Sequence, residues 1–364
     1  MTYCIENPRD PVCQRELEAI AASDLNWDAF RNRTVLVTGA TGLVGSYAVR
    51  ALAAINRLHG CEMHILAMVR SPEKARALYG PLLDRGDLSL LVGDVRNPIQ
   101  CDTPVHFIIH GASVTASKEM VTRPVETIAT AIGGTQNILQ FAADQKVTSM
   151  VYISSMEMYG SPDPNLDCVT EQDYGFVDVL NVRSCYPEGK RMCECLCAAY
   201  AKEYQLPVKI ARLAQTFGAG VSPSETRVFA QFARSLIHGE DIVLHTEGKS
   251  YGNYCATCDC VRGLLTILLR GADGEAYNVV NESTNIQIRD MAQMIADQSG
   301  GAIQVRFDIP ADALQYGYAP DVKMHLSGAK LRGLGWTPEV DLPEMYQRLI
   351  ASWEAQQTSS DMAQ

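Results

Sequence analysis

From residue 34 to about residue 213, short runs of consecutive apolar residues alternate with longer segments in which apolar residues recur every three or four positions. The short runs indicate buried strands, and the longer segments indicate amphipathic helices. The predicted strands cover residues 34–37, 63–69, 88–92, 106–110, 149–154 and 208–213. The predicted helices cover residues 43–58, a short stretch from residue 72, 124–143 and 186–204. Buried strands that alternate with helices are typical of a parallel sheet covered on both faces.

The pattern becomes less regular after residue 213, where a loop rich in glycine, serine and proline covers residues 218–226. We predict short helices at residues 226–238, 258–270, 288–299 and 342–355, and strands at 242–245 and 276–280. The chain is therefore expected to divide into an N-terminal extension at 1–29, a large domain at 30–213, a smaller C-terminal α/β lobe mainly at 214–356, and a tail at 357–364. Within the range of the lobe, residues 258–272 can return to the large domain. For the extension, a helix on the outside of the domain or at a subunit contact is the default expectation.

Composition excludes several classes of protein. The chain has 364 residues, 47% of them apolar, which is enough for a full core. No run of 18 apolar residues indicates a membrane span, and the first ten residues, with Glu6, Arg9 and Asp10, do not resemble a secretory signal. A net charge of −11 argues against nucleic-acid binding. We expect a cytoplasmic protein.

The twelve cysteines are expected to be reduced thiols. Two groups need weighing as metal ligands: Cys193, Cys195 and Cys197, and Cys255, Cys258 and Cys260. The first group lies on one predicted helix, where neighbours two positions apart point about 200° away from each other. The second group lacks another Cys or His pair with matching spacing. We therefore predict no metal site.

A glycine-rich loop follows the first predicted strand. The sequence Thr38-Gly39-Ala40-Thr41-Gly42-Leu43-Val44-Gly45 joins this strand to the helix at 43–58. Such glycines permit a tight turn and a close approach to a pyrophosphate, whose charge meets the helix N-terminus. We predict a Rossmann-type, doubly wound parallel α/β sheet that binds NAD(P); the alternative is a plain turn and helix cap. The expected cofactor contacts from the loop and from the ends of the third and fourth strands are Gly39, Thr41, Gly42, Leu43, Val44, Gly45, Asp94, Val95, Ala112 and Ser113.

The second strand ends in Arg70, with Lys74 one turn further on. An NAD site usually presents a carboxylate there, whereas a basic group suits the 2′-phosphate of NADP. The sequence therefore favours NADP mildly over NAD, against the alternative that Arg70 is simply exposed to solvent.

Tyr186 and Lys190 are the strongest catalytic candidates. Residues four apart lie on one face of a helix, so the ammonium can stabilise a phenolate and bring the pKa of the phenol towards neutrality. Such a phenolate can deprotonate a sugar hydroxyl while hydride leaves the same carbon. Either the glycine loop or this pair alone would be weak evidence for chemistry on a nicotinamide cofactor. Because the pair follows the loop in the chain and the loop joins a predicted strand to a helix, the two motifs support each other.

Several motifs together resemble one family. They are the glycine loop, Gly93-Asp94-Val95, His110-Gly111-Ala112-Ser113, Ser154-Ser155-Met156-Glu157-Met158-Tyr159-Gly160, Tyr186 with Lys190, and Leu331-Arg332-Gly333-Leu334-Gly335-Trp336-Thr337-Pro338. They resemble the extended short-chain dehydrogenase/reductases, the NAD(P)-dependent nucleotide-sugar epimerase/dehydratase group, over residues 34–353. The segment 183–191 is most similar to the UDP-glucuronate decarboxylases, or UDP-xylose synthases.

The resemblance implies roles for individual residues. Ser155 would bond the substrate oxygen beside Tyr186, and Lys190 would also contact the nicotinamide ribose. Oxidation at C4 of the sugar would give a transient ketone, Glu157 would handle a proton or orient the substrate, and Arg183 would orient a C5 carboxylate. The alternatives are a strand-end hydroxyl bonded to the backbone for Ser155 and a surface carboxylate for Glu157.

The fate of the ketone stays open between a decarboxylase and a 4-epimerase. Similar dehydratases place an Asp before the Glu, and Met156 occupies that position here, so 4,6-dehydration is disfavoured. Two other functions remain possible: an NADPH-dependent carbonyl or ketosugar reductase, and a non-catalytic dinucleotide-binding regulatory protein. The intact set of Ser155, Tyr186 and Lys190 argues against the second.

One position departs from the family pattern. An Arg that grips the substrate diphosphate precedes an aromatic by two residues in the resembling family, and Gly252 stands there in this chain, before Asp259. Either Arg212 or Arg227 takes over the diphosphate, or the substrate is not an ordinary nucleoside diphosphate sugar. The resemblance also implies a homodimer formed through the helices at 124–143 and 187–204.

Overall fold

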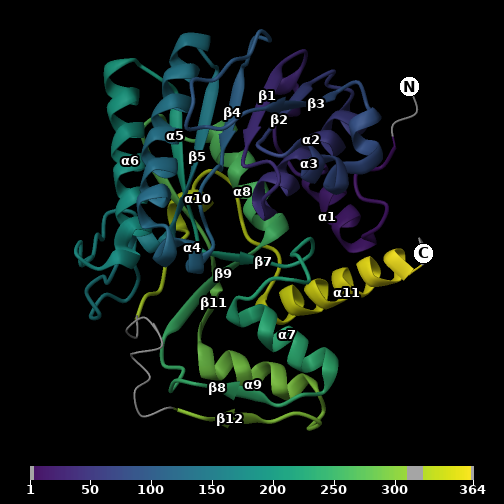
Figure 1. Cartoon of the computed structure of the whole chain (residues 1–364), viewed down its shortest axis with the longest axis vertical. Coiled ribbons are helices and arrows are strands. Elements are labelled where there is room, and N and C mark those ends of the chain that lie inside the picture. The colour runs from purple at the N-terminus through teal and green to yellow at the C-terminus, as the bar shows by residue number, and fades with distance from the viewer. Residues whose placement is uncertain (1–3, 310–322, 362–364) are drawn as a thin grey trace.

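A seven-stranded parallel sheet forms the centre of the computed structural model, which describes residues 4–309 and 323–361 (Figure 1). The strand order is β10-β6-β5-β4-β1-β2-β3. Strands β1 to β3 extend the sheet in one direction and strands β4, β5, β6 and β10 extend it in the other, as in a doubly wound Rossmann fold. Six of the strands fall where the apolar runs predict them. The strands are β1 (Thr34–Thr38), β2 (His64–Val69), β3 (Leu88–Val92), β4 (Phe107–His110), β5 (Ser149–Ser155), β6 (Val208–Leu213) and β10 (Ala276–Val279).

Helices cover both faces of this sheet. In β1, Val35 and Val37 pack into a core with α2 (Leu43–His59) and α8 (Thr257–Arg270). Leu36 points to the opposite face, where α5 (Pro124–Gln145) and α6 (Cys185–Glu203) complete a second core. Residues on both faces of the inner strands are therefore buried, which explains why the runs are mostly apolar, although β6 carries Lys209 and Arg212 and the edge strand β3 is partly exposed. Two shorter helices, α3 (Pro72–Tyr79) and α4 (Ser117–Thr122), follow β2 and β4.

The smaller lobe lies beyond the carboxyl ends of the strands (Figure 1). Its three-stranded sheet has the order β11-β9-β7, and β8 pairs with β12. Two helices pack on these strands. The elements are β7 (Gln215–Phe217), α7 (Val228–His238), β8 (Ile242–Leu244), β9 (Tyr251–Ala256), β11 (Asn281–Gln287), α9 (Ile288–Gln298) and β12 (Val305–Phe307).

The chain crosses between the two parts more often than the sequence indicated. Helix α8 packs on the large sheet, and the short helix α10 (Ala329–Arg332) lies against β10. The prediction of a strand near residues 276–280 is confirmed, but its expected place in the lobe is wrong, because β10 pairs in parallel with β6. The sequence of a four-residue strand does not indicate which strand it pairs with, and the preceding strand, β9, belongs to another sheet.

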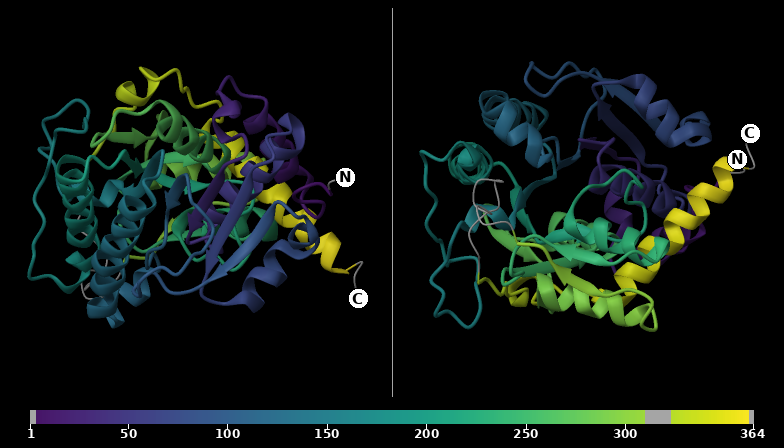
Figure 2. Two further views of the ribbon diagram at one scale, coloured as in Figure 1. Left: turned by 90° about the horizontal axis from the view of Figure 1, so that it is seen from above. Right: turned by 60° about the horizontal axis from the view of Figure 1, so that its bottom comes forward.

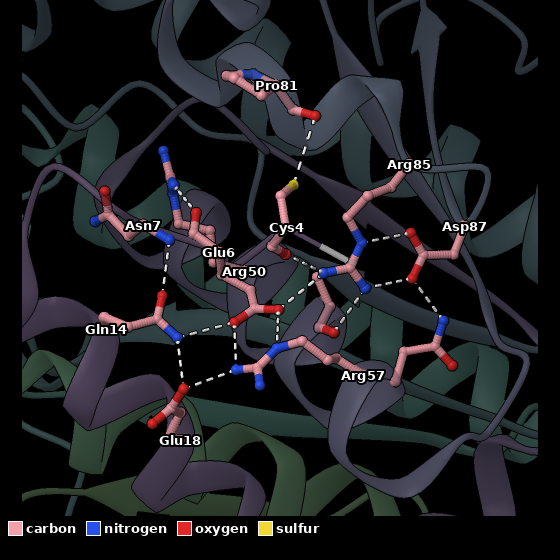
Figure 3. A network of polar contacts seen from close by, with 12 residues as sticks. Cys4, Glu6, Asn7, Gln14, Glu18, Arg50, Arg57, Pro81, Arg85 and Asp87 are labelled. Atoms are coloured by element: carbon pink, nitrogen blue, oxygen red, sulfur yellow. Dashed lines mark hydrogen bonds and ion pairs between the residues drawn. The ribbon is translucent and has the colours of Figure 1, made fainter. Parts of the chain in front are cut away.

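The N-terminal segment is anchored on the large domain. Helix α1 (Pro11–Ala21) packs against α2 and against the C-terminal helix α11 (Leu342–Asp361), which runs beside it (Figures 1 and 2). The buried carboxylate of Glu6 bonds Arg57 at 2.9 Å and Arg85 at 2.8 Å, and Arg85 also bonds Asp87 at 2.6 Å (Figure 3). Within the described ranges, no helix combines the length and the hydropathy that crossing a membrane would require.

Candidate active site

The glycine loop forms a cradle that side chains would fill. Gly39 has φ +68°, and a Cβ there would lie 2.7 Å from the backbone carbon of Gly111. A Cβ at Gly45 would lie 2.2 Å from the carbonyl oxygen of Gly39. Gly42 precedes α2 and no side chain caps this helix. The backbone can therefore approach a pyrophosphate closely at the start of α2, in the turn that also holds Thr41, Leu43 and Val44, and a dinucleotide fits these residues.

Arg70 and Asp94 follow β2 and β3, which are neighbours in the sheet. Arg70 is exposed. The carboxylate of Asp94 accepts a bond of 2.7 Å from Nη2 of Arg96. This bond, with a further contribution from the charge of Arg70, lowers the pKa of Asp94. Both predicted residues therefore lie at the edge where a cofactor ribose is expected.

The remaining predicted cofactor residues also lie at the carboxyl ends of strands. Val95 is buried, and its carbonyl accepts a bond of 2.8 Å from Nδ2 of Asn137 on α5. Ala112 and Ser113 follow β4 and are half-buried. The amide of Ala112 donates to Oγ1 of Thr38 at 3.2 Å, which ties the ends of β4 and β1 together.

The same hydroxyl is held by a buried histidine. His110 contacts Oγ1 of Thr38 at 2.7 Å and Oγ1 of Thr135 at 3.2 Å. Burial, with a further contribution from the charge of Lys190, lowers the pKa of His110 to about 3. The imidazole is therefore neutral and supports the cofactor loop.

Tyr186 and Lys190 lie together on α6, as their spacing predicts. They are 8% and 4% exposed. Nζ of Lys190 lies 5.7 Å from the centre of the Tyr186 ring and donates to the carbonyl of Ile153 at 2.7 Å. The pair is therefore buried at the end of β5, beside the predicted cofactor residues of β4.

The expected lowering of the tyrosine pKa is not found in this geometry. Burial raises the pKa of Tyr186 and the charge of Glu157 raises it further, whereas Ser155, Arg183 and Arg227 lower it. Burial lowers the pKa of Lys190 to about 8. Desolvation outweighs the groups that lower the pKa, and the ammonium of Lys190 bonds a backbone carbonyl, so Tyr186 keeps its proton at neutral pH in this geometry.

Ser155, Glu157 and Arg183 gather around this tyrosine. Ser155 ends β5, and its Oγ accepts the amide of Glu157 at 3.2 Å. Glu157 lies on the 3-10 turn Met156–Tyr159 and pairs with Nη2 of Arg183 at 2.8 Å. The guanidinium carbon of Arg183 lies 5.7 Å from the centre of the Tyr186 ring. The structure thus brings the four predicted catalytic residues and Arg183 to one place.

Arg212 does not join them. It is 1% exposed, and its five N–H groups bond the carboxylate of Glu194, the hydroxyls of Tyr159 and Tyr174, and the carbonyl of Glu171. No donor is left for a diphosphate, contrary to the prediction. An arginine in a fully buried strand must pair with a carboxylate, and this signal was present in the sequence.

Arg227 remains as the cation that faces the site from the lobe. It precedes α7, its side chain is 46% exposed, and it pairs with Glu225 at 2.8 Å. Its charge contributes to lowering the pKa of Tyr186. At Gly252, a Cβ would lie 2.4 Å from the hydroxyl of Tyr254, so the tyrosine ring fills the space of a side chain there.

Known proteins resemble this chain over most of its length. The model of the NAD dependent epimerase/dehydratase family matches residues 35–280. UDP-glucuronic acid decarboxylase 1 of Xenopus tropicalis is 27% identical over 318 residues, which cover 87% of this chain and 71% of the relative. UDP-glucuronic acid decarboxylase 3 of Arabidopsis thaliana is 28% identical over 325 residues, which cover 86% of each chain.

Two solved structures share the fold. A dTDP-glucose 4,6-dehydratase from Streptomyces venezuelae, with NAD and TYD bound, has a TM-score of 0.73 and 24% identity, and the match covers 90% of this chain and 98% of the other. A UDP-glucose 4-epimerase from Thermotoga maritima, with UDP-glucose, has a TM-score of 0.71 and 18% identity, with coverage of 88% and 98%. With a family model that spans well over half of its residues, this chain belongs to the NAD dependent epimerase/dehydratase family.

Proposed function

We propose that this protein is a redox-neutral nucleotide-sugar decarboxylase that acts on a UDP-linked uronic acid through a transient 4-keto sugar. The observation that carries the proposal is the ion pair of Arg183 with Glu157 beside the ring of Tyr186. The curated relatives described above, which are decarboxylases of UDP-glucuronic acid, support the choice of substrate.

The first and last steps exchange a proton and a hydride at C4. A bound nicotinamide would supply the acceptor for the hydride of C4 and, once reduced, its donor in the last step. Before Tyr186 can act as a base it must lose its own proton, and the positive charge of a bound oxidised nicotinamide would add to that of Lys190 in favouring the phenolate. The phenolate then takes the proton of the C4 hydroxyl and later returns it, while Ser155 bonds the same oxygen. A buried phenolate needs a positive neighbour, and Lys190 carries that charge below pH about 8.

The middle step needs little further catalysis. A ketone at C4 makes the C5 carboxylate that of a β-keto acid, which releases carbon dioxide and leaves an enol. Arg183 can hold the carboxylate before it leaves, and Glu157, which is partly exposed to solvent, can relay a proton from water to C5. Met156 offers no proton to a leaving hydroxyl, so elimination of water is disfavoured.

Mass spectrometry of the products tests the proposal. The protein and a catalytic amount of NAD, incubated with UDP-glucuronic acid, should give a UDP-pentose lighter by carbon dioxide, with no net change in reduced cofactor. Tyr186→Phe is the control and should bind the nucleotide without turnover.

Other products point to the alternatives. An epimeric uronic acid of unchanged mass would instead indicate a 4-epimerase. Stoichiometric consumption of NADPH would indicate a reductase, and no reaction with any UDP- or dTDP-sugar would favour a regulatory protein.

We propose that Arg227 binds the substrate diphosphate. The tyrosine ring beside Gly252 occupies the place of the expected arginine, and Arg212 has no free donor. Arg227 is exposed and close enough to Tyr186 to contribute to its pKa. Arg227→Ala should raise KM about tenfold or more through the loss of a charged phosphate contact, with a smaller effect on kcat.

We propose that Arg70 influences the choice of cofactor. Its exposed guanidinium can meet the 2′-phosphate of NADP, which favours NADP, whereas the family description and the dehydratase structure name NAD. Titration calorimetry with both cofactors decides between them. Arg70→Ala should weaken NADP at least tenfold more than NAD if the phosphate contact exists.

We propose that the protein forms a homodimer through α5 and α6. Val125, Ile128 and Met192 on these helices are 78%, 41% and 48% exposed. Exposed large apolar side chains on neighbouring helices are suited to burial in a protein–protein interface. Light scattering after gel filtration should give twice the chain mass. Val125→Glu with Met192→Glu should give a monomer, and an unchanged dimer would place the interface elsewhere.

A further inference from the structure

Three polar residues occupy successive turns on one buried face of α6. Tyr186, Lys190 and Glu194 are spaced four residues apart and are 8%, 4% and 7% exposed. The first two belong to the proposed catalytic set, whereas Glu194 has no part in it. Burial of a carboxylate is costly unless a charged partner compensates it.

The partner of Glu194 is Arg212 on β6. Nη2 of Arg212 donates to Oε2 of Glu194 at 2.7 Å, and Nε lies 3.1 Å from each carboxylate oxygen. The same carboxylate accepts the hydroxyl of Ser154 at 2.5 Å. Ser154 pairs with Arg212 across β5 and β6 and immediately precedes Ser155. The ion pair therefore fixes the end of β5 to the helix of Tyr186.

The other donors of Arg212 reach the segment that follows β5. Nη1 donates to the hydroxyl of Tyr159 at 2.9 Å and to the carbonyl of Glu171 at 2.8 Å, and Nη2 donates to the hydroxyl of Tyr174 at 3.1 Å. The guanidinium carbon also lies 4.9 Å and 5.2 Å from the centres of these two rings. Tyr159 ends the turn that carries Glu157, and Glu194 bonds Ser154 at the end of β5 and lies on the helix of Tyr186. The ion pair of Glu194 and Arg212 therefore contacts every segment that contributes a proposed catalytic side chain.

We propose that Glu194 and Arg212 are a positioning pair, which keeps the four proposed catalytic side chains in register without touching the substrate. The inference rests on the proposed function, because it gives the pair a task in that reaction. A misplacement of about 1 Å at a catalytic group can cost about 100-fold in rate. The pair should therefore affect kcat more than its effect on stability explains.

A buried ion pair elsewhere in the chain provides a matched control. The side chain of Arg85 is 3% exposed and bonds Glu6 at 2.8 Å and Asp87 at 2.6 Å. It lies beside β3, at the opposite end of the sheet from β6. If the pair of Glu194 and Arg212 had a purely structural role, Arg212→Lys would behave like Arg85→Lys. If it is a positioning pair, the two variants should lose similar stability but differ in kcat.

The experiment compares kcat and KM for UDP-glucuronic acid, the Kd for NAD and the unfolding midpoint in urea. We expect similar losses of stability in Arg212→Lys and Arg85→Lys, with kcat reduced about 10- to 100-fold only in the former and NAD affinity within twofold of wild type. Tyr174→Phe, at a residue that is 59% exposed, removes one acceptor without risk to folding and should lower kcat about 2- to 10-fold. Unchanged kcat in Arg212→Lys and Tyr174→Phe, or an equal loss in Arg85→Lys, would overturn the inference.

A second measurement does not depend on turnover. Competitive labelling of amines with acetic anhydride, read by mass spectrometry, reports the pKa of Lys190. Glu194 contributes to raising this pKa, so Glu194→Gln should lower it. An unchanged pKa would contradict the coupling, and a wild-type protein without turnover would contradict only the proposed function. The groups that face Lys190 are Cys193, Glu194 and Cys197 on α6, Glu157 on the 3-10 turn, His110 on β4, Tyr152 on β5 and Tyr186.

Discussion

Replacing Lys190 by methionine tests the electrostatics of the site through stability rather than through catalysis. Burial lowers the pKa of this amine from its ordinary value of 10.5 to about 8. In the unfolded chain the amine is solvated and regains the ordinary value. The unfolded state therefore binds more protons between about pH 8 and pH 10.5, and the wild-type protein gains stability as the pH rises through this window.

The size of the effect follows from the two pKa values. At about 1.4 kcal/mol for each unit, their difference corresponds to about 3 kcal/mol, which the folded protein loses at neutral pH and recovers in alkali. Methionine carries no charge, so its variant lacks this dependence. The bond from Lys190 to the carbonyl of Ile153 is also lost, but this loss is nearly the same at each pH and cancels in the comparison.

Urea unfolding of both proteins at pH 7, 8, 9 and 10, followed by tryptophan fluorescence, measures the difference. The free energy of unfolding of the wild type, minus that of Lys190→Met, should rise by about 2 to 3 kcal/mol across the series. Lys249→Met is the control, because the Lys249 side chain is 53% exposed and its variant should show no such trend. A flat difference for Lys190 would mean that the amine is solvated in the folded protein and that burial does not lower its pKa.

Three further results are expected. Gly45→Ala places a Cβ 2.2 Å from a backbone oxygen and should weaken NAD binding more than tenfold by calorimetry, whereas Gly86→Ala, with nothing within 4 Å, should leave it unchanged. Glu6→Gln removes the buried carboxylate that Arg57 and Arg85 share, although Glu18 and Asp87 still pair with them, and should cost about 2 to 3 kcal/mol in urea unfolding, against less than about 1 kcal/mol for the exposed Asp28→Asn. The buried hydroxyl of Tyr254 has no hydrogen-bond partner within the described ranges, so Tyr254→Phe should raise the unfolding free energy by about 1 kcal/mol; a loss would reveal an unrecognised partner.

The large sheet could be predicted from sequence because its signal is local. Each of the six strands from β1 to β6 is a mostly apolar run, as expected of a sheet whose two faces are covered by helices. The position of β10 in the sheet could not be predicted in this way, because the sequence of a short strand indicates that it is buried but not which strand it pairs with. The anchoring of α1 was likewise hidden, because Glu6 and Arg57 lie far apart in the chain and only the fold joins them.

The candidate site divides in the same way. Tyr186 with Lys190, and Ser155 with Glu157, are close in sequence, and backbone geometry alone brings each pair together. Arg212 was wrongly expected to bind the substrate because an arginine invites an anionic ligand. Its place in a strand without an exposed residue implies instead an internal carboxylate, and Glu194 stands one turn beyond Lys190.

The residues that bind the substrate are harder to predict from the sequence than the residues that carry out the chemistry, and the reason is physical. The hydride and proton transfers need a few groups at fixed separations, which one helix and one strand end supply. The rest of the substrate must be held by the lobe, whose residues reach the site only through tertiary packing. Arg227 illustrates this, because its charge contributes to the pKa of Tyr186 although two strands, a loop and most of α6 separate the two in the chain. A substitution in the lobe can therefore alter the binding of the substrate while the catalytic segment stays the same.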